Sequence, residues 1–512
     1  MILQGDKDQP GGPASAGGAT LDELFRRAGV QSSGALALAD PPNRQDFTDH
    51  APRRLTYAQA DRAISALAAK LCRLGLQTDT VVAIQLPNTV DAVITLLAVL
   101  RAGMIAVPMP LLWRSHELKT ALSKVGAKAI VTTARVGAIA HAELAMQVAA
   151  ELFPVRFICA FGEDLPDGAV PLDDIFAAEQ PSIAPRSLRA GHAADHVAVV
   201  TFDVTPDGLV AAARSHAQLM AGGSAVFLEA GAARNANILS AIPPSSFAGL
   251  AASVLPWLLD GGTLSLHHGF DPVTLFGQCQ DHIGGMIVLP GPALAAIGSA
   301  ASLAGANTTI AALWRSPEQL MSAPSWRGEC VLVDIACFGE VGLVAMHRGP
   351  EGLPAEIPLG PVGRHNPAGA ALETQRGKHG TLALRGAMVP VHVFLPGANH
   401  GFEPTYAVDE SGFVDTGFTC RGDPSAQRLI VTGPPGGITI IGGYRFRPAE
   451  LEAQLAAADP AATLVALPGG VMAQRLAGSA LDHITVRDRL LENGANPLLA
   501  GAFRPRGQAN AA

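Results

Sequence analysis

The chain has 512 residues, of which 48% are hydrophobic and 16% are charged, and its net charge is −8. This length is enough for three or four units of about 150 residues, and the composition predicts a packed multidomain protein and excludes general disorder. Only six residues are lysine, so no basic stripe is available to neutralise a nucleic-acid backbone. We therefore expect no nucleic-acid partner.

The six cysteines are widely spaced and form no CxxC pair, which indicates neither a zinc knuckle nor a disulfide framework. They are interpreted as buried thiols of a reducing, cytoplasmic compartment. Residues 1–20 are polar and rich in Gly and Pro, without an apolar core of signal-peptide length, and are interpreted as a flexible leader. The most hydrophobic stretch, residues 92–112, is interrupted by Arg101, Gly103 and two prolines, so no transmembrane segment is predicted.

Helical and strand-like segments alternate through the first 360 residues. Residues 55–72 carry apolar side chains at helical spacing after Thr56, which suits an N-cap. Residues 81–86 form a short β-rich run, and residues 90–103 predict a helix that ends at Gly103. This alternation predicts an open α/β architecture whose parallel sheet is covered on both faces. The same rhythm returns at residues 127–133, 155–161, 196–202 and 237–244.

After residue 360 the pattern changes to short strand-like segments separated by Gly and Pro. These segments lie at residues 380–386, 389–395 and 428–433. Such a pattern is typical of a smaller β-rich module.

Residues 433–437, GPPGG, are interpreted as a hinge, and Pro448 suits the first turn of a short helix over residues 448–455. The chain is therefore expected to contain two domains joined by a short linker. The predicted boundaries are a leader at 1–20, a large N-terminal domain at 21–432 with a β-rich subdomain at about 360–432, the hinge, and a shortened C-terminal domain at 438–512.

Several long blocks follow the order found in the adenylate-forming superfamily, which includes acyl-CoA synthetases, luciferases and the adenylation domains of nonribosomal peptide synthetases. The blocks are LTYAQA, VVAIQLPNTVDAVITLLAVLRAGMIAVPMP, AKAIVTT, AIPPSSFAGLAASVLPWLLDGG, GTLALRGAMV and IIGGYRFRPAELEAQL. The chain thus resembles an AMP-dependent acyl-CoA synthetase/ligase of this ANL superfamily. The resemblance implies two α/β lobes and a β-rich subdomain, followed by a small α+β lid. It also implies activation of a carboxylate with ATP and Mg to an acyl-adenylate, and transfer of the acyl group to CoA or a carrier thiol.

The phosphate loop of the family reads roughly T-S-G-T-T-G-x-P-K-G, and its glycines let backbone N–H groups approach phosphate oxygens. The matching stretch here is TFDVTPDGLV at residues 201–210. It keeps Thr201, Thr205 and Gly208, which the resemblance makes candidates for nucleotide binding. Thr205 is also a candidate for a catalytic role.

Other positions of this loop have changed. Two glycines are lost, and the lysine position falls on Leu209 or Val210. Asp203 and Asp207 place negative charge where an anion would bind, and each such pair of like charges costs about 4 kcal/mol at close range. The stretch is therefore expected to repel triphosphate, and its structural alternative is a surface turn after a strand.

The family's aromatic-Gly-x-Thr-Glu motif resembles Phe338, Gly339 and Glu340. In the family the aromatic ring lies near adenine and the Glu holds magnesium, so these three residues are candidates for cofactor binding, and Glu340 for metal binding and catalysis. An exposed loop carboxylate is the alternative for Glu340. The aromatic-His pair that gates the family's acyl site falls on Ser245 and Ser246.

The family's Thr-Gly-Asp triplet, whose Asp accepts the ribose hydroxyls, matches Thr416, Gly417 and Phe418. Thr416 and Gly417 remain candidates for cofactor binding. Phe418 cannot accept a hydrogen bond, and its replacement by Asp415 would need a shift of three residues.

The hinge and lid also depart from the family. Its Gly-Arg-x-x-Asp hinge aligns with residues 433–437, where both charged residues are lost. Gly442 and Gly443 are kept at the position where the family's backbone approaches the thiol tunnel, although a Gly-Gly turn before a helix is the alternative.

The family's lid ends in a lysine that clamps the carboxylate and the α-phosphate. No lysine follows Lys378, and the tail offers only Arg504 and Arg506. Elsewhere, His267 and His268 are adjacent on an expected strand, so they face opposite ways and do not share a metal.

The positions that the family uses to bind phosphate, to bind ribose and to supply the lid lysine are thus all affected. We predict an acyl-CoA synthetase-like protein with impaired or lost ATP-dependent adenylation, which binds a small carboxylate, an acyl-CoA or an acyl-carrier thiol. The alternatives are an active carboxylate-CoA ligase and a non-catalytic subunit of an active paralogue. ATP with Mg and CoA are the cofactors implied by the resemblance, and a homodimer or a paralogue complex is the protein partner to test.

Overall fold

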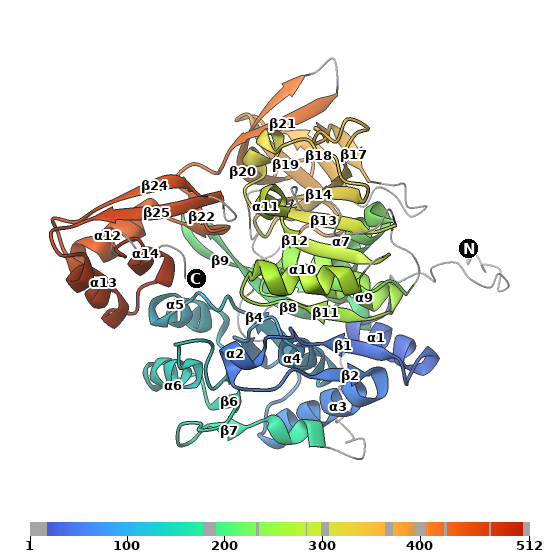
Figure 1. The fold of residues 1–512 in the computed structure, drawn as a ribbon, viewed down its shortest axis with the longest axis vertical. Coiled ribbons are helices and arrows are strands. Elements are labelled where there is room, and N and C mark those ends of the chain that lie inside the picture. Colours follow the sequence, from blue (N-terminus) through green and yellow to red (C-terminus); the bar gives the residue numbers. More distant parts are fainter. Residues whose placement is uncertain are drawn as a thin grey trace.

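The computed structural model describes residues 18–177, 191–231, 235–282, 284–297, 307–363, 372–391, 394, 406, 408–423, 427–469 and 473–504. Two large sheets with helices between and around them form the body of the molecule, a β-rich part lies at one end, and a small α+β part lies at one side (Figure 1). This is a mixed α/β fold, as the sequence predicts.

The first sheet has seven strands in the order β7-β6-β5-β3-β4-β8-β9, all parallel except for β9, which is antiparallel to β8. It is buried on both faces, because alternate residues of β3, β4, β5 and β6 pack into different hydrophobic clusters. The strands are β3 (Val81–Ile84), β4 (Ile105–Pro108), β5 (Ala129–Thr133), β6 (Phe157–Phe161), β7 (Val170–Pro171), β8 (Val197–Thr205) and β9 (Gly208–Ser215).

Helices cover this sheet at the predicted places. Thr56 caps α3 (Tyr57–Arg73) through a capping box with Gln59, and every residue of α4 (Val90–Arg101) is buried. On the other face, α5 (Ser115–Val125) and α6 (His141–Glu151) contribute Leu118 and Val148 to the second cluster. The predicted doubly covered sheet is confirmed.

The second sheet has eight strands in the order β15-β14-β13-β12-β10-β11-β1-β2, and α7 (His216–Ala230) packs against it. The helical stretch that precedes β11 is continuous but changes pitch, from α8 (Phe247–Gly249) through one π-helical turn (Leu250–Val254) to α9 (Leu255–Asp260). The strands are β1 (Leu36–Ala39), β2 (Arg54–Thr56), β10 (Ile238–Ser240), β11 (Leu264–Leu266), β12 (Met286–Pro290), β13 (Thr309–Trp314), β14 (Val331–Phe338) and β15 (Gly342–His347).

The β-rich part is a six-stranded antiparallel sheet in the order β16-β21-β20-β19-β18-β17. Of the predicted segment 389–395, residues 389–391 and 394 are not in a strand, and the others lie outside the described residues. The strands are β16 (Ile357–Pro358), β17 (Gly360–Val362), β18 (Leu372–Arg376), β19 (Thr381–Gly386), β20 (Val414–Asp423) and β21 (Arg428–Gly433).

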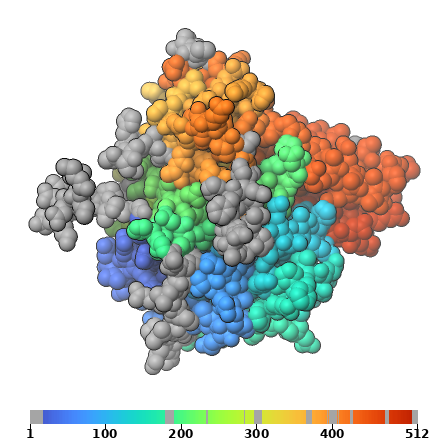
Figure 2. Space-filling view, turned by 180° about the vertical axis from the view of Figure 1, so that it is seen from behind, coloured from blue at the N-terminus to red at the C-terminus, as the bar shows by residue number. Residues whose placement is uncertain are grey.

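The last part of the chain, residues 439–503, is called the C-terminal segment below. It has a hydrophobic cluster of its own and lies beside α5 and β9 (Figures 1 and 2). Its elements are β22 (Thr439–Ile441), β23 (Tyr444–Phe446), α12 (Pro448–Ala458), β24 (Thr463–Gly469), β25 (Ala473–Ser479), α13 (His483–Glu492) and α14 (Pro497–Gly501).

Five of the six cysteines are buried and Cys72 is half-buried, and all six are free thiols, as predicted. Within the described parts of the chain, no helix combines the length and the apolar character needed to cross a bilayer.

A buried charge cluster fixes the start of α4. The Arg44 guanidinium pairs with Asp40 at 2.5 Å and also with Asp91, and Asp40 accepts the Val90 N–H at 2.7 Å. Arg44 is 1% exposed. Burial raises the pKa of Asp40, although the Arg44 charge acts in the opposite direction. Removal of the cation would leave the buried Asp40 carboxylate without a counter-charge, whereas Asp91 would keep its ion pair with Arg53 at 2.8 Å.

Arg44→Met is therefore expected to lower the free energy of unfolding by about 3–5 kcal/mol. Arg135 and Asp49 form an exposed ion pair and provide the matched control, so Arg135→Met is expected to leave the free energy of unfolding almost unchanged. Urea denaturation followed by circular dichroism measures both variants. Equal losses for the two would contradict the assignment of Arg44 as the buried cation that stabilises this region.

Candidate functional site

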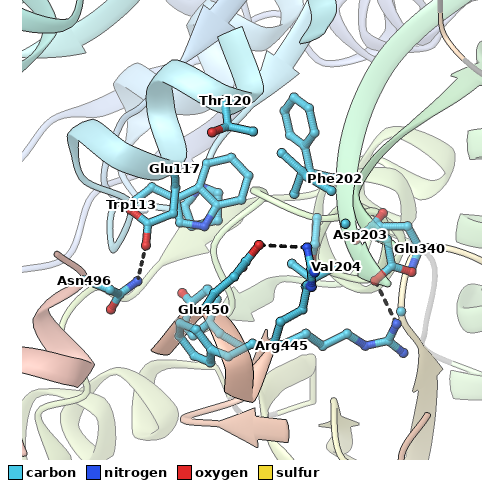
Figure 3. A pocket seen from close by; sticks show the side chains of 18 of the residues that line it. Trp113, Glu117, Thr120, Phe202, Asp203, Val204, Glu340, Arg445, Glu450 and Asn496 are labelled. Carbon is cyan, nitrogen blue, oxygen red and sulfur yellow. Dashed lines mark hydrogen bonds and ion pairs between the residues drawn. The ribbon is translucent and has the colours of Figure 1, made fainter. Parts of the chain in front are cut away.

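A cavity of about 600 Å³ opens between α5, the β8–β9 hairpin and the C-terminal segment. Its walls combine aromatic and apolar side chains, including Trp113, Phe202 and Leu209, with charged ones from both sides. Figure 3 shows Trp113 and Glu117 from α5 and its preceding loop facing Asn496 and Glu450 from the C-terminal segment. The cavity is therefore a candidate site that both parts of the chain build.

The floor of this cavity is a tight hairpin rather than an open loop. Strands β8 and β9 remain paired up to Thr205 opposite Gly208, so only Pro206 and Asp207 form the turn. The Thr205 hydroxyl donates to the Gly208 carbonyl at 3.0 Å, and Gly208 has a φ of 126°, which favours glycine. Most of the stretch matched to the phosphate loop is thus part of a strand ladder.

Asp203 lies within this ladder and is paired with the C-terminal segment. Arg445 of β23 donates from Nη1 to Asp203 Oδ1 at 2.7 Å, while the Glu340 N–H and the Tyr406 hydroxyl donate to Oδ2 at 2.9 and 3.3 Å. Asp203 is 3% exposed. The expectation that Asp203 presents negative charge to a ligand is therefore corrected, because Arg445 already neutralises that charge. Asp203 and Asp207 both line the cavity.

Glu340 lies inside the site and is not an exposed loop carboxylate. Its Oε2 accepts the Thr201 hydroxyl at 2.5 Å and the Phe247 N–H at 3.0 Å, and Arg214 Nη1 lies 3.5 Å away. Burial raises the pKa of Glu340, and the Arg214 charge acts in the opposite direction. Arg214 also donates to the Glu340 carbonyl and stacks on the Phe247 ring with 3.8 Å to its centroid. All of these partners are groups of the protein itself, and together they fix the position of Glu340.

Phe418 fills space beside Glu340. It is fully buried, its ring meets Phe338 edge-on at 5.5 Å between centroids, and the Arg445 guanidinium lies 4.9 Å above it. Asp415, the alternative ribose carboxylate, accepts from the Thr381 hydroxyl and the Gly417 N–H instead and does not line the cavity. The positions matched to adenine and ribose contacts therefore pack against each other.

The structure brings together only some of the candidate residues that the sequence indicates. Gly208, Gly339, Glu340 and Gly443 line the cavity, as do Ser245 and Ser246. Thr201, Thr205, Phe338, Thr416, Gly417 and Gly442 do not line it. The Thr416 hydroxyl donates to the Leu382 carbonyl at 2.7 Å and so stabilises the strand pair β19–β20. Arg504 is not in the cavity wall, and Arg506 lies outside the described residues.

Contacts across the cavity join the C-terminal segment to the body at two further points. Asn496 Nδ2 donates to Glu117 Oε1 at 3.3 Å, and Arg315 lies 5.3 Å from the centroid of the Tyr444 ring. Arg315 also donates to the Ser246 hydroxyl at 3.2 Å. These side chains define the rim of the cavity.

Sequence reasoning missed Arg445, Arg214 and Tyr406. Burial lowers the pKa of Arg214 and raises that of Tyr406 well above its usual value. One signal for Arg445 is available in the sequence, because an aspartate in an otherwise apolar strand requires a cation. Nothing in a single sequence identifies which arginine supplies it.

Cys337 and the adjacent residues His267 and His268 are further groups whose side chains could take part in a reaction. Cys337 lines the cavity, but burial raises the pKa of its thiol to about 12, so it is not a thiolate nucleophile. His267 contacts Gln278 at 2.8 Å, whereas His268 accepts the Asn88 N–H at 3.4 Å, in line with the expectation that the two rings face different ways. In the described residues, no cluster of three or more His, Cys, Asp or Glu side chains has the arrangement of a metal site.

The residues present do not fit MgATP in this arrangement. The family's magnesium carboxylate corresponds to Glu340, which accepts from Thr201 and Phe247, and the ribose position is the buried Phe418 ring. The place of the phosphate loop is a closed hairpin with Asp203 paired to Arg445.

Comparison with known proteins identifies the family of this chain. Residues 35–307 match the family described as AMP-binding enzyme. Feruloyl-CoA synthase from Amycolatopsis sp is 30% identical over 226 residues, which are 44% of this chain and 41% of that protein. A long-chain-fatty-acid–CoA ligase from Yersinia pestis is 42% identical over 113 residues, which are 22% of this chain and 18% of the ligase. The matched part thus covers less than half of either relative.

Solved structures show the same fold over nearly the whole chain. The amide bond synthetase McbA from Marinactinospora thermotolerans superposes with a TM-score of 0.69 at 18% identity, covering 95% of this chain and 94% of that one. The anthranilate CoA ligase AuaEII, solved with anthranoyl-AMP, superposes with a TM-score of 0.66 at 14% identity, covering 95% and 92%. Together with the match over residues 35–307, these similarities show that the chain belongs to the AMP-binding enzyme family of adenylate-forming, acyl-CoA synthetase-like proteins.

Proposed function

We propose that this chain is a family member that does not adenylate a carboxylate efficiently and instead binds an acyl, CoA or carrier-thiol group. The observation that carries the proposal is the Asp203–Arg445 ion pair at 2.7 Å, which places the protein's own charges where the family's phosphate loop lies. A triphosphate would have to displace Arg445 from a carboxylate that is 3% exposed. Removal of one partner from a buried ion pair is costly.

The ribose and metal positions support the same proposal. Phe418 has no hydrogen-bonding group on its side chain, and its ring is held between Phe338 and Arg445. Glu340 Oε2 receives two hydrogen bonds from the protein and has Arg214 nearby. Magnesium would compete with these partners for the same carboxylate.

The cavity supports binding of an acyl or thiol group. Its volume of about 600 Å³ is within the usual range for small-molecule sites, and it combines apolar walls with a few convergent polar groups. Trp113, Phe202 and Leu209 offer surface to an apolar chain or ring, and Arg315 and Arg447 offer charge to an anionic end. We further propose that residues 433–437 are a hinge between domains at 21–432 and 438–512.

An active carboxylate-CoA ligase is the second candidate function. Glu340 and Gly443 line the cavity, so two positions that the family uses face the proposed site. This candidate requires Asp203, Glu340 and Phe418 to rearrange when nucleotide binds.

A non-catalytic subunit is the third candidate. The C-terminal segment exposes the apolar side chains Val465, Leu481 and Ile484, which are 55%, 102% and 57% exposed. Exposed apolar side chains that gather in one patch commonly mark an interaction surface.

Calorimetric titration with MgATP is expected to give no heat of binding up to millimolar nucleotide, whereas a panel of aryl- and fatty-acyl-CoA esters is expected to include a ligand that binds. The physical reason is that Arg445 and Phe418 occupy the nucleotide contacts, while the cavity stays open. Micromolar MgATP binding together with carboxylate-dependent release of pyrophosphate would establish the active ligase. Absence of heat with every acyl-CoA would contradict the proposed thioester binding.

The double change Phe418→Asp with Leu209→Lys restores two residue types of the family, yet we expect no gain in pyrophosphate release. No lysine follows Lys378, so the lid lysine is still absent. The new carboxylate would also be buried against the Phe338 ring and would compete with Asp203 for the Arg445 cation, so the melting temperature should fall. A clear gain in MgATP-dependent activity, measured by a coupled pyrophosphate assay, would show that the remaining site is catalytically competent. Leu209→Lys alone is the matched control.

A further inference from the structure

The C-terminal segment folds around its own core, so its orientation depends on contacts with the body. Its hydrophobic cluster contains only residues from Ile441 to Phe503. The polar contacts to the body described above are Arg445 with Asp203, Asn496 with Glu117, and Arg315 with the Tyr444 ring. These few contacts determine how the segment sits over the cavity.

The Asp203–Arg445 contact differs from the others in burial. The Arg445 side chain is 11% exposed and that of Asp203 is 3% exposed. Both carboxylate oxygens of Asp203 are bonded, one to Arg445 and the other to the Glu340 N–H and the Tyr406 hydroxyl. Removal of one partner from a buried ion pair costs far more stability than removal of one partner from an exposed pair.

The backbone beside this ion pair leaves space for both side chains. Gly339 has a φ of 60°, and a Cβ at this position would overlap both Asp203 Oδ2 and Arg445 Nη1. A glycine therefore leaves the space in which the ion pair forms. The Arg445 guanidinium also lies over the Phe418 ring, so its charge has a second partner.

We propose that Asp203 and Arg445 form an intramolecular latch that fixes the C-terminal segment over the cavity and keeps the position of the phosphate loop occupied by the protein's own cation. Movement of the segment away from the body would separate a buried carboxylate from its counter-charge. The segment therefore stays in one orientation unless a ligand replaces Arg445. This latch does not depend on whether the cavity binds an acyl thioester.

The orientation of the segment can be measured by pulsed electron paramagnetic resonance between spin labels at Val30→Cys and Leu481→Cys, in a Cys72→Ser background. Val30 and Leu481 are 87% and 102% exposed, so labels there disturb little packing. The unmodified latch is expected to give one narrow distance distribution. Arg445→Gln and Asp203→Asn are each expected to increase the population of other distances by roughly tenfold or more.

Arg489→Gln is the matched control, because Arg489 is an arginine of the same segment whose side chain donates to the Ala458 carbonyl within it. This variant should keep the narrow distribution. The double variant Asp203→Asn with Arg445→Gln should open no further than either single variant, because coupled partners are not additive.

Gly339→Ala tests the latch without a change of charge. The added Cβ should push the pair apart and broaden the distances as the charge variants do, with near-UV circular dichroism verifying that the body stays folded. Unchanged distances in Arg445→Gln and Asp203→Asn would overturn the latch. A broadening in Arg489→Gln equal to that in Arg445→Gln would overturn it as well, because any weakening of the segment would then suffice.

Discussion

The burial of one carboxylate, that of Asp203, constrains much of the site. It lies in the ladder of β8 and β9, where it has almost no access to water, so its charge must be met by the protein. Arg445 supplies the cation from 242 residues away, and the Glu340 N–H supplies a second donor. Gly339 has no side chain, so the Asp203 carboxylate and the Arg445 guanidinium fit beside it. We propose that the orientation of the C-terminal segment and the closure of the nucleotide position follow from this requirement.

The replaced residues form a mutually consistent set. An aspartate at position 418 would add a third carboxylate to those of Asp203 and Glu340, whereas the phenyl ring packs on Phe338 and under Arg445. The positive charge of Arg214 offsets the negative charge of Glu340. Burial lowers the pKa of Arg214 and raises the pKa of Glu340. Side chains at positions that the family uses for nucleotide contacts thus contact each other in this structure. Such agreement is typical of a site whose residues stabilise one arrangement of the fold.

Much of the fold could be predicted from local patterns, because strand and helix periodicity and caps such as Thr56 depend on near neighbours in sequence. The loss of the ribose acceptor at Phe418 was also readable, since a phenyl ring lacks any acceptor. The partner of Asp203 could not be predicted from the sequence. Arg445 is 242 residues away, and its contact with Asp203 depends on how two parts of the chain dock. For the same reason the sequence predicted a loop that repels anions. The structure instead has a hairpin in which Arg445 neutralises Asp203.

We propose that the protein's own side chains occupy the nucleotide position. A crystal structure of the full chain grown with excess magnesium and a non-hydrolysable ATP analogue would test this proposal. In that structure Asp203 is expected to stay paired with Arg445, and Phe418 to stay packed on Phe338, with no nucleotide between them. A bound analogue with Arg445 displaced from Asp203, and with magnesium on Glu340, would contradict it.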